Sequence, residues 1–204
     1  MAQNTSGLHA ILSHPKVYSL FQNLMGAEAH WKNFAESNIR PSVGMRILDI
    51  GCGPCGILRY LPNTEYYGFD ISESYISQAR LIYGTRGNFF AKNFTEEYLE
   101  ILPKFDVVIA SGLLHHLDDG IAVDLLKLVR EALQPGGRFL SIDPVFEPGQ
   151  NPIARLIISN DRGRNVRTCS GYLELVRHAF EICSAEVRHR AWIPYTHCYM
   201  TCVR

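Results

Sequence analysis

Residues 46–56, with the sequence RILDIGCGPCG, restrict the possible folds of this chain more than any other segment. The run RILDI predicts a short buried strand, and this strand leads directly into a glycine-rich turn. Gly51, Gly53 and Gly56 lack a Cβ, so the main chain of the turn can approach a ligand closely. A strand followed at once by such a turn is typical of an α/β domain that binds a nucleotide-like molecule.

The charge at the mouth of this turn separates two kinds of ligand. Residues 51–56 also fit the dinucleotide pattern G-x-G-x-x-G, in which a pyrophosphate lies at a helix N-terminus. Asp49 would repel that pyrophosphate. It would attract S-adenosylmethionine, which carries a sulfonium and an ammonium group and no phosphate. The sequence therefore favours this methyl donor. The alternatives are a nicotinamide-dependent oxidoreductase that uses the same turn, and a non-catalytic donor-binding protein.

Length and composition limit the number of domains and the kinds of partner. A chain of 204 residues with 47% hydrophobic residues forms one domain, or one domain with a small cap. The balance of 20 basic and 20 acidic residues predicts no nucleic-acid or membrane partner, and no apolar run is long enough to cross a bilayer. No secretory signal is recognisable, so we expect a cytoplasmic protein with reduced cysteines, as a monomer or homodimer.

The spacing Cys52-x-x-Cys55 raises the question of a metal site. Both cysteines lie in the glycine turn, where small side chains are needed, and the chain has no second C-x-x-C pair. Cys198 and Cys202 are four residues apart on an expected strand, which separates them too far to hold one ion. We therefore expect no metal.

Strands and helices alternate along the chain. Apolar residues at helical spacing near the N-terminus predict a first helix, namely Val17, Leu20, Phe21, Leu24 and Met25. Residues 1–44 thus predict an N-terminal helical cap, and residues 45–204 a single α/β domain. The last two strands are joined by too few residues for a parallel crossover, so they must be antiparallel. Strands are expected at 46–50, 66–70, 88–92, 105–110, 138–143, 186–192 and 196–203, and helices from 56, at 72–83 with Ser72 as the N-cap, at 119–132 and at 172–180.

Several motifs together carry a family resemblance. They are LDIGCGP, then YYGFD, then FDVVIASGLLHHLDD, then LQPGGRFLSID, followed by the antiparallel pair. In this order and spacing the chain resembles the class I S-adenosylmethionine-dependent methyltransferases of the small-molecule type, from about residue 46 to residue 204. The resemblance implies an α/β, Rossmann-like, seven-stranded and mostly parallel sheet with an antiparallel C-terminal hairpin and helices on both faces.

The same resemblance implies a donor site at the ends of the strands. The turn would hold the methionine half, Asp70 the ribose hydroxyls and Ile71 the adenine, whereas Cys55 departs from a common third glycine. The expected donor-binding residues are Asp49, Gly51, Cys52, Gly53, Asp70, Ile71, Asn93, Phe94, Ser111 and His116.

Candidate residues for catalysis and for acceptor binding lie later in the chain. Methyl transfer needs a base only if the acceptor must lose a proton, and a histidine titrates near neutral pH. We expect His115 and Asp143 to be catalytic. The segment 161–167, DRGRNVR, suggests an anionic acceptor, because arginine suits carboxylate and phosphate groups. A solvated loop paired with acidic residues is the alternative. The expected acceptor-binding residues are Arg162, Arg164, Arg167, Tyr195 and His197.

Overall fold

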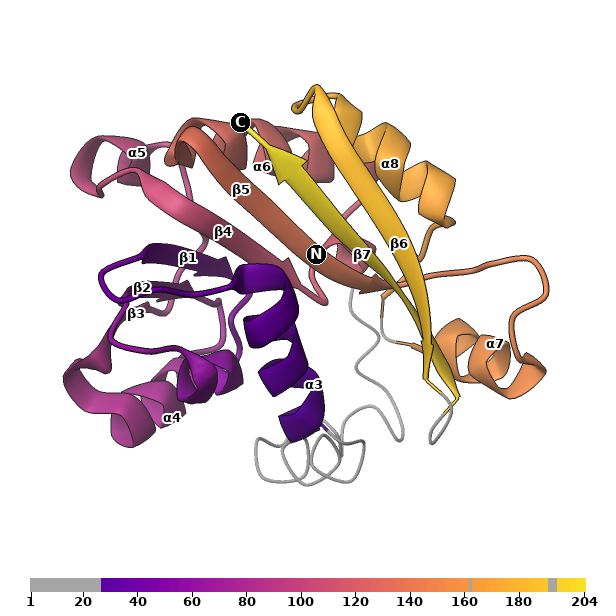
Figure 1. Ribbon diagram of the computed structural model, residues 1–204, viewed down its shortest axis with the longest axis horizontal. Helices are drawn as coiled ribbons and strands as arrows, with labels where there is room; N and C mark the ends of the chain where they lie inside the picture. The colour runs from indigo at the N-terminus through magenta and orange to yellow at the C-terminus, as the bar shows by residue number, and fades with distance from the viewer. Residues whose placement is uncertain (1–26, 162, 191–193) are drawn as a thin grey trace. The chain divides into compact units, whose positions relative to one another are not determined.

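The computed structural model describes residues 27–161, 163–190 and 194–204 (Figure 1). Arg162 lies outside the described residues. So does the first expected helix, which was predicted from Val17, Leu20, Phe21, Leu24 and Met25. The described chain divides after Phe94 into two compact units, and each is described by itself. The expected boundary between a cap and a main domain at residue 44 stays a prediction.

The first unit, residues 27–94, contains three parallel strands. They are β1 (Arg46–Ile50), β2 (Glu65–Phe69) and β3 (Gly87–Phe90), in the order β3-β2-β1. Ser72 begins a helix as predicted, because its hydroxyl accepts a hydrogen bond from the Tyr75 N–H. The remaining elements of this unit are α3 (Ala27–Phe34), the π-helical turn η1 (Ala35–Ile39), the 3₁₀ helices η2 (Gly56–Tyr60) and η3 (Gly84–Arg86), and α4 (Glu73–Tyr83).

The second unit, from residue 95 onward, contains four strands in the order β4-β5-β7-β6. β4 (Phe105–Ser111) and β5 (Leu133–Pro144) are parallel, and β7 (Tyr195–Val203) is antiparallel to both β5 and β6 (Ile182–Arg190). The helices of this unit are α5 (Glu97–Ile101), the 3₁₀ helix η4 (Leu114–His116), α6 (Asp119–Ala132), α7 (Pro152–Ser159) and α8 (Cys169–Arg177).

The burial of the strands explains the hydrophobic pattern of the sequence. Four successive residues of β4, Val107 to Ala110, are all buried, so both faces of this strand are covered. β7 instead alternates between buried and half-buried residues, as a strand with one covered face does. The whole strand order is β3-β2-β1-β4-β5-β7-β6, which confirms the predicted seven-stranded, mostly parallel sheet with its antiparallel C-terminal pair.

The structure differs from the expectation at several places, among them two boundaries and one helix. β5 begins at Leu133 rather than residue 138, because Leu133 pairs with Phe105 before a register shift in the β4–β5 ladder. α8 begins at Cys169, since Thr168 caps it through the Gly171 N–H. α7 was not predicted, although Asn151 caps it and Pro152 occupies its first turn.

Candidate functional site

The glycine turn after β1 has the backbone that its sequence predicts. Gly51 and Gly53 have φ values of 73° and 53°, in the left-handed region that favours glycine. Cys55, which departs from the family pattern, takes a φ of 57° despite its side chain. A Cβ on Gly53 would meet no atom within 4 Å, so the turn is open at this point.

The two cysteines of the turn fill space beside β2. A Cβ on Gly68 would lie 3.0 Å from the Cys52 Sγ and 3.2 Å from the Cys55 Sγ, so the thiols occupy the room that this glycine leaves. A hydrogen bond with Cys55 and burial raise the pKa of Cys52 well above its usual value. The Cys52 thiol is therefore protonated at neutral pH, which agrees with a packing role rather than a reactive one.

Asp49 is a buried carboxylate with one side-chain hydrogen-bond partner among the described residues. Only 4% of the residue is exposed, and the Tyr66 hydroxyl donates a hydrogen bond of 2.6 Å to its Oδ2. Burial is the main reason that the pKa of Asp49 rises to about 7; nearby Asp70 adds to the rise and the Tyr66 hydrogen bond opposes it. Near neutral pH the carboxyl is poised between its two forms, so a cationic ligand would favour ionisation.

Asp70 ties the glycine turn to the start of α4. Its Oδ2 accepts the Gly53 N–H at 2.9 Å, and its Oδ1 accepts the Ser72 N–H at 2.8 Å. A carboxylate has about four acceptor sites, so Asp70 can still accept hydrogen bonds from a ribose. Ile71 follows it and is 52% exposed, which leaves its side chain accessible to a ligand.

The two residues after β3 have different environments. Asn93 is exposed, whereas Phe94 is buried and packs edge-on against Phe69 with 5.2 Å between the ring centroids. Asn93 is thus accessible to an adenine, and Phe94 belongs to the core of its unit. Their donor-binding roles stay predictions.

In the second unit, His115 lies between two carboxylates. Its Nδ1 is 2.9 Å from the Asp143 Oδ1, and its Nε2 is 3.2 Å from the Asp161 Oδ1. The Ser141 hydroxyl donates to the other Asp143 oxygen at 2.5 Å. Burial works against charge on the imidazole, but the hydrogen bonds to Asp143 and Asp161 prevail and raise the pKa of His115 to about 9. The two predicted catalytic residues are therefore in contact.

Asp161 is itself held in place. The Tyr195 hydroxyl donates to its Oδ2 at 2.8 Å, and the Gly163 N–H donates to its Oδ1 at 3.0 Å. Burial would raise the pKa of Asp161, yet the hydrogen bond with His115 lowers it below its usual range. The carboxylate is therefore ionised at neutral pH.

Apart from the arginines, the remaining predicted residues of this unit lie on β4, η4 and β7. The rings of His115 and His116 are 4.0 Å apart, and those of Tyr195 and His197 are 4.7 Å apart. Ser111 is the half-buried last residue of β4. Tyr195 thus joins the His115 cluster through Asp161, and the ligand-binding roles of these residues stay predictions.

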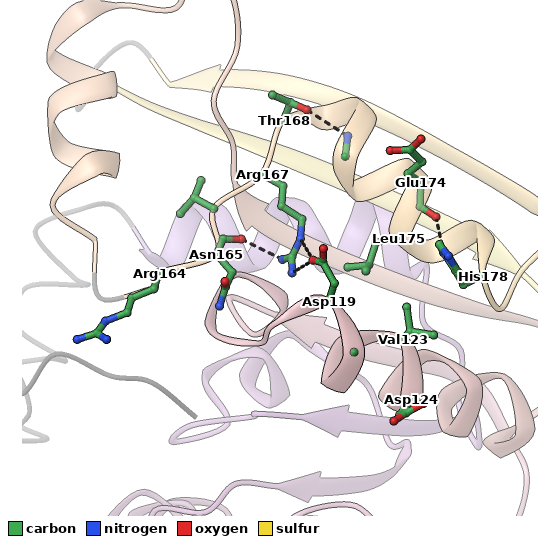
Figure 2. A pocket seen from close by; sticks show the side chains of 13 residues that line it. Asp119, Val123, Asp124, Arg164, Asn165, Arg167, Thr168, Glu174, Leu175 and His178 are labelled. Carbon is green, nitrogen blue, oxygen red and sulfur yellow. Dashed lines mark hydrogen bonds and ion pairs between the residues drawn. The ribbon is translucent and has the colours of Figure 1, made fainter.

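The predicted arginines differ sharply from one another. Arg167 donates all five of its N–H groups: to Asp119 and to the carbonyls of Leu114, Leu117 and Asn165. No donor is left for an anionic acceptor. Arg164 is exposed, and Figure 2 shows its side chain pointing away from the Arg167–Asp119 pair.

A groove of about 910 Å³ lies beside these arginines, between α6 and α8 (Figure 2). Asp119, Val123, Glu174 and Leu175 are among its lining residues, but the His115 cluster is not. The groove is therefore separate from the candidate catalytic residues.

Sequence reasoning missed Tyr66, Ser141, Asp161 and Gly163 as functional residues. Tyr66 could have been found, because the parallel register pairs Asp49 with Gly68 and places Tyr66 two residues earlier on the same face of β2. Ser141 stands two residues before Asp143 on one strand and shares its face in the same way. Asp161 and Gly163 follow α7 in a loop, where no periodic signal exists.

Comparisons with known proteins agree with these features. Residues 48–139 match a family model described as a methyltransferase domain. A segment of 84 residues is 37% identical to acetylserotonin O-methyltransferase of Mus musculus and covers 38% of this chain and 21% of the mouse protein.

Two solved structures have a similar fold. The mitomycin 7-O-methyltransferase MmcR is 17% identical with a TM-score of 0.67, and the pyocyanin biosynthetic protein PhzM is 19% identical with a TM-score of 0.70. Each similarity covers 98% of this chain and 62% of the other, so the chain spans less than two thirds of either protein. With the glycine turn and the strand order, these matches confirm the predicted resemblance to the class I S-adenosylmethionine-dependent methyltransferases.

Proposed function

We propose that this protein transfers the methyl group of S-adenosylmethionine to a hydroxyl oxygen of a small molecule, and that His115 accepts the hydroxyl proton. The observation that carries the proposal is the buried Ser141–Asp143–His115 chain of hydrogen bonds. Asp143 fixes the imidazole by bonding its Nδ1, which directs Nε2 toward a reacting group. An acceptor hydroxyl needs such a base, because it must lose a proton as it attacks the sulfonium methyl.

Asp161 holds the position that the acceptor would take. While Asp161 is bound to Nε2, two carboxylates stabilise the imidazolium and His115 cannot act as a base. A hydroxyl that replaces Asp161 at Nε2 removes one of these carboxylates, so the pKa of His115 falls toward its ordinary value. The released Asp161 keeps its hydrogen bonds from Tyr195 and Gly163.

The donor side of the proposal rests on the first unit. The open turn at Gly53 would accommodate the methionine half, with Asp49 near its ammonium group and Asp70 at the ribose. A methyl transfer by in-line displacement needs mainly alignment and exclusion of water, since the sulfonium is already activated.

The nature of the acceptor is a narrower proposal. The mouse relative is named for O-methylation of acetylserotonin, which favours a hydroxylated aromatic ring. An anionic group on the acceptor is a hypothesis that rests on Arg164, because Arg167 has no free donor.

None of the helices in the described part of the chain has the length and apolar character of a membrane span. The cytoplasmic location and the monomeric or homodimeric state stay predictions.

The test separates donor binding from proton transfer. Calorimetry with S-adenosylhomocysteine and with NADH should show binding of the first alone. Transfer of labelled methyl to a panel of phenols should fall by about a hundredfold or more in His115→Gln, the size of a lost general base, with unchanged S-adenosylhomocysteine affinity. His178→Gln, which changes an exposed histidine of the same unit, is the control. Full activity of His115→Gln would refute the role of His115, and NADH binding would refute the donor assignment.

A further inference from the structure

The imidazoles of His115 and His116 and the carboxylate of Asp161 form a cluster with the chemistry of a metal site. Each offers one ligand atom, and these three atoms lie within 4.8 Å of one another. It is the one such group of three or more His, Cys, Asp or Glu side chains in the described parts of the chain. We predicted no metal from the cysteine spacing and did not consider Asp161, which is distant in sequence from both histidines.

We propose that this cluster binds a divalent transition-metal ion through one nitrogen from each histidine and one oxygen from Asp161. This inference goes beyond the proposed function, and it does not require that methyl transfer occurs. Two imidazoles and a carboxylate suit Zn²⁺, Co²⁺, Ni²⁺ or Fe²⁺, whereas Mg²⁺ and Ca²⁺ prefer oxygen ligands throughout.

The separation of the ligand atoms fits such an ion. Two ligands at about 2.0–2.2 Å from a metal are about 3–3.5 Å apart in octahedral or tetrahedral geometry. The His115 Nε2 and the Asp161 Oδ1 are 3.2 Å apart. The His116 ligand nitrogen lies within 4.8 Å of the other two ligand atoms, so its ring would have to shift for the three to share one ion. Three protein ligands leave at least one position open for an exchangeable ligand.

The surroundings of the cluster already orient two of the three ligands. Asp143 binds the Nδ1 of His115, which is the carboxylate–histidine arrangement that supports metal-bound imidazoles. Tyr195 and Gly163 hydrogen-bond to the carboxylate of Asp161. Such outer contacts fix the ligands before an ion arrives, so binding requires little reorganisation.

The local charge also favours a cation. Within the described residues, the ion-pair partner of both Asp143 and Asp161 is His115, and neither carboxylate pairs with a lysine or arginine. With neutral imidazoles the site carries two negative charges, which a divalent ion would neutralise. The ion would occupy Nε2 and thereby compete with the proton and with an acceptor for His115.

The experiment uses Co²⁺ as a spectroscopic probe of the full chain. We expect one ion per chain, visible d–d absorption, and no thiolate-to-cobalt charge transfer, because the ligand set contains no sulfur. His116→Gln and Asp161→Asn should each weaken Co²⁺ binding by about tenfold or more, whereas His178→Gln should not change it. His116→Gln leaves the Asp143–His115–Asp161 contacts in place, so it is the variant expected to fold normally.

The outcomes are distinct from those of the proposed function. Absence of Co²⁺ binding, equal binding by the variants, or a charge-transfer band from cysteine would overturn the metal site, whether or not the protein methylates a phenol. If the metal binds as expected, loaded protein should lose any methyl transfer and regain it when a chelator removes the ion. Activity that persists at full occupancy would refute the competition at Nε2.

Discussion

Replacement of Asp49 by asparagine should make the protein more stable and a poorer binder of the methyl donor. Asp49 is 4% exposed and has the Tyr66 hydroxyl as its side-chain partner. Its carboxylate is thus buried with little to stabilise its charge, and an amide of the same shape has no charge to bury. Stability should rise while donor affinity falls. This combination distinguishes a carboxylate that binds a ligand from one that stabilises the folded protein.

The size of the stability effect follows from the pKa. Burial raises the pKa of Asp49 from 3.8 to about 7, a difference of about three units, and each unit corresponds to about 1.4 kcal/mol. The pKa of Asp49 is higher in the folded protein than in the unfolded chain. The contribution of Asp49 to the free energy of unfolding is therefore most favourable below pH 3.8 and is lost as the pH rises through about 7. The asparagine variant should therefore gain up to roughly 4 kcal/mol over wild type at about pH 8, and much less at about pH 5.

The donor affinity should change in the other direction. An ammonium group binds the ionised carboxylate, which is a minor form at about pH 6 and the main form at about pH 8. The affinity of wild type for S-adenosylhomocysteine should then rise about tenfold over this interval. Asp49→Asn should bind more weakly at the higher pH and lose this pH dependence.

Two measurements on one set of samples test both parts. Urea denaturation followed by circular dichroism gives the stability at each pH, and calorimetry gives the affinity for S-adenosylhomocysteine. Asp124→Asn, which removes an exposed aspartate of α6, is the control for a change of net charge. Wild-type affinity in Asp49→Asn at the higher pH would refute the electrostatic argument for the donor, even if the variant were more stable.

Two further predictions concern the segment 161–167. Arg167→Ala should lower the free energy of unfolding by about 2–4 kcal/mol, because three main-chain carbonyls lose a charged donor, whereas exposed Arg164→Ala should change it little. Equal unfolding free energies in urea would contradict this. Gly163→Ala should reduce methyl transfer by at least about tenfold without changing donor affinity, because its Cβ would collide with the His115 ring; Gly120→Ala, with its nearest neighbour at 3.6 Å, should retain activity in the same assay.

The sequence predicted the features that local signals determine. α6 begins and ends where its amphipathic pattern does, and Asp118 caps it through the Ile121 N–H. β4 was found from a continuous apolar run, because a strand covered on both faces has no polar face to interrupt it, and β1 was found from the apolar residues that lead into the glycine turn. The glycine turn was found because its backbone takes φ values that favour glycine, and Asp70 was found as the acid at the end of an expected strand.

The contacts that complete the candidate site could not be predicted in this way. Asp161 reaches His115 across 46 positions of sequence, and this contact depends on the path of the loop after α7. Arg164 and Arg167 have the same charge and lie three residues apart, yet one is exposed and the other is enclosed by carbonyl groups. The sequence gives no signal that distinguishes the two arginines, because their different environments arise from the tertiary structure.

These contacts give the segment 161–167 a different role from the one that its arginines suggested. Several contacts of the segment are with η4 or the residue that follows it: Asp161 bonds the His115 imidazole, the Asn165 N–H bonds the His115 carbonyl, and Arg167 bonds the carbonyls of Leu114 and Leu117. Because these bonds fix both the main chain and the ring of His115, the segment orients the proposed base. Asp161 and Arg167 are therefore explained by the geometry of His115 before any anionic acceptor is invoked.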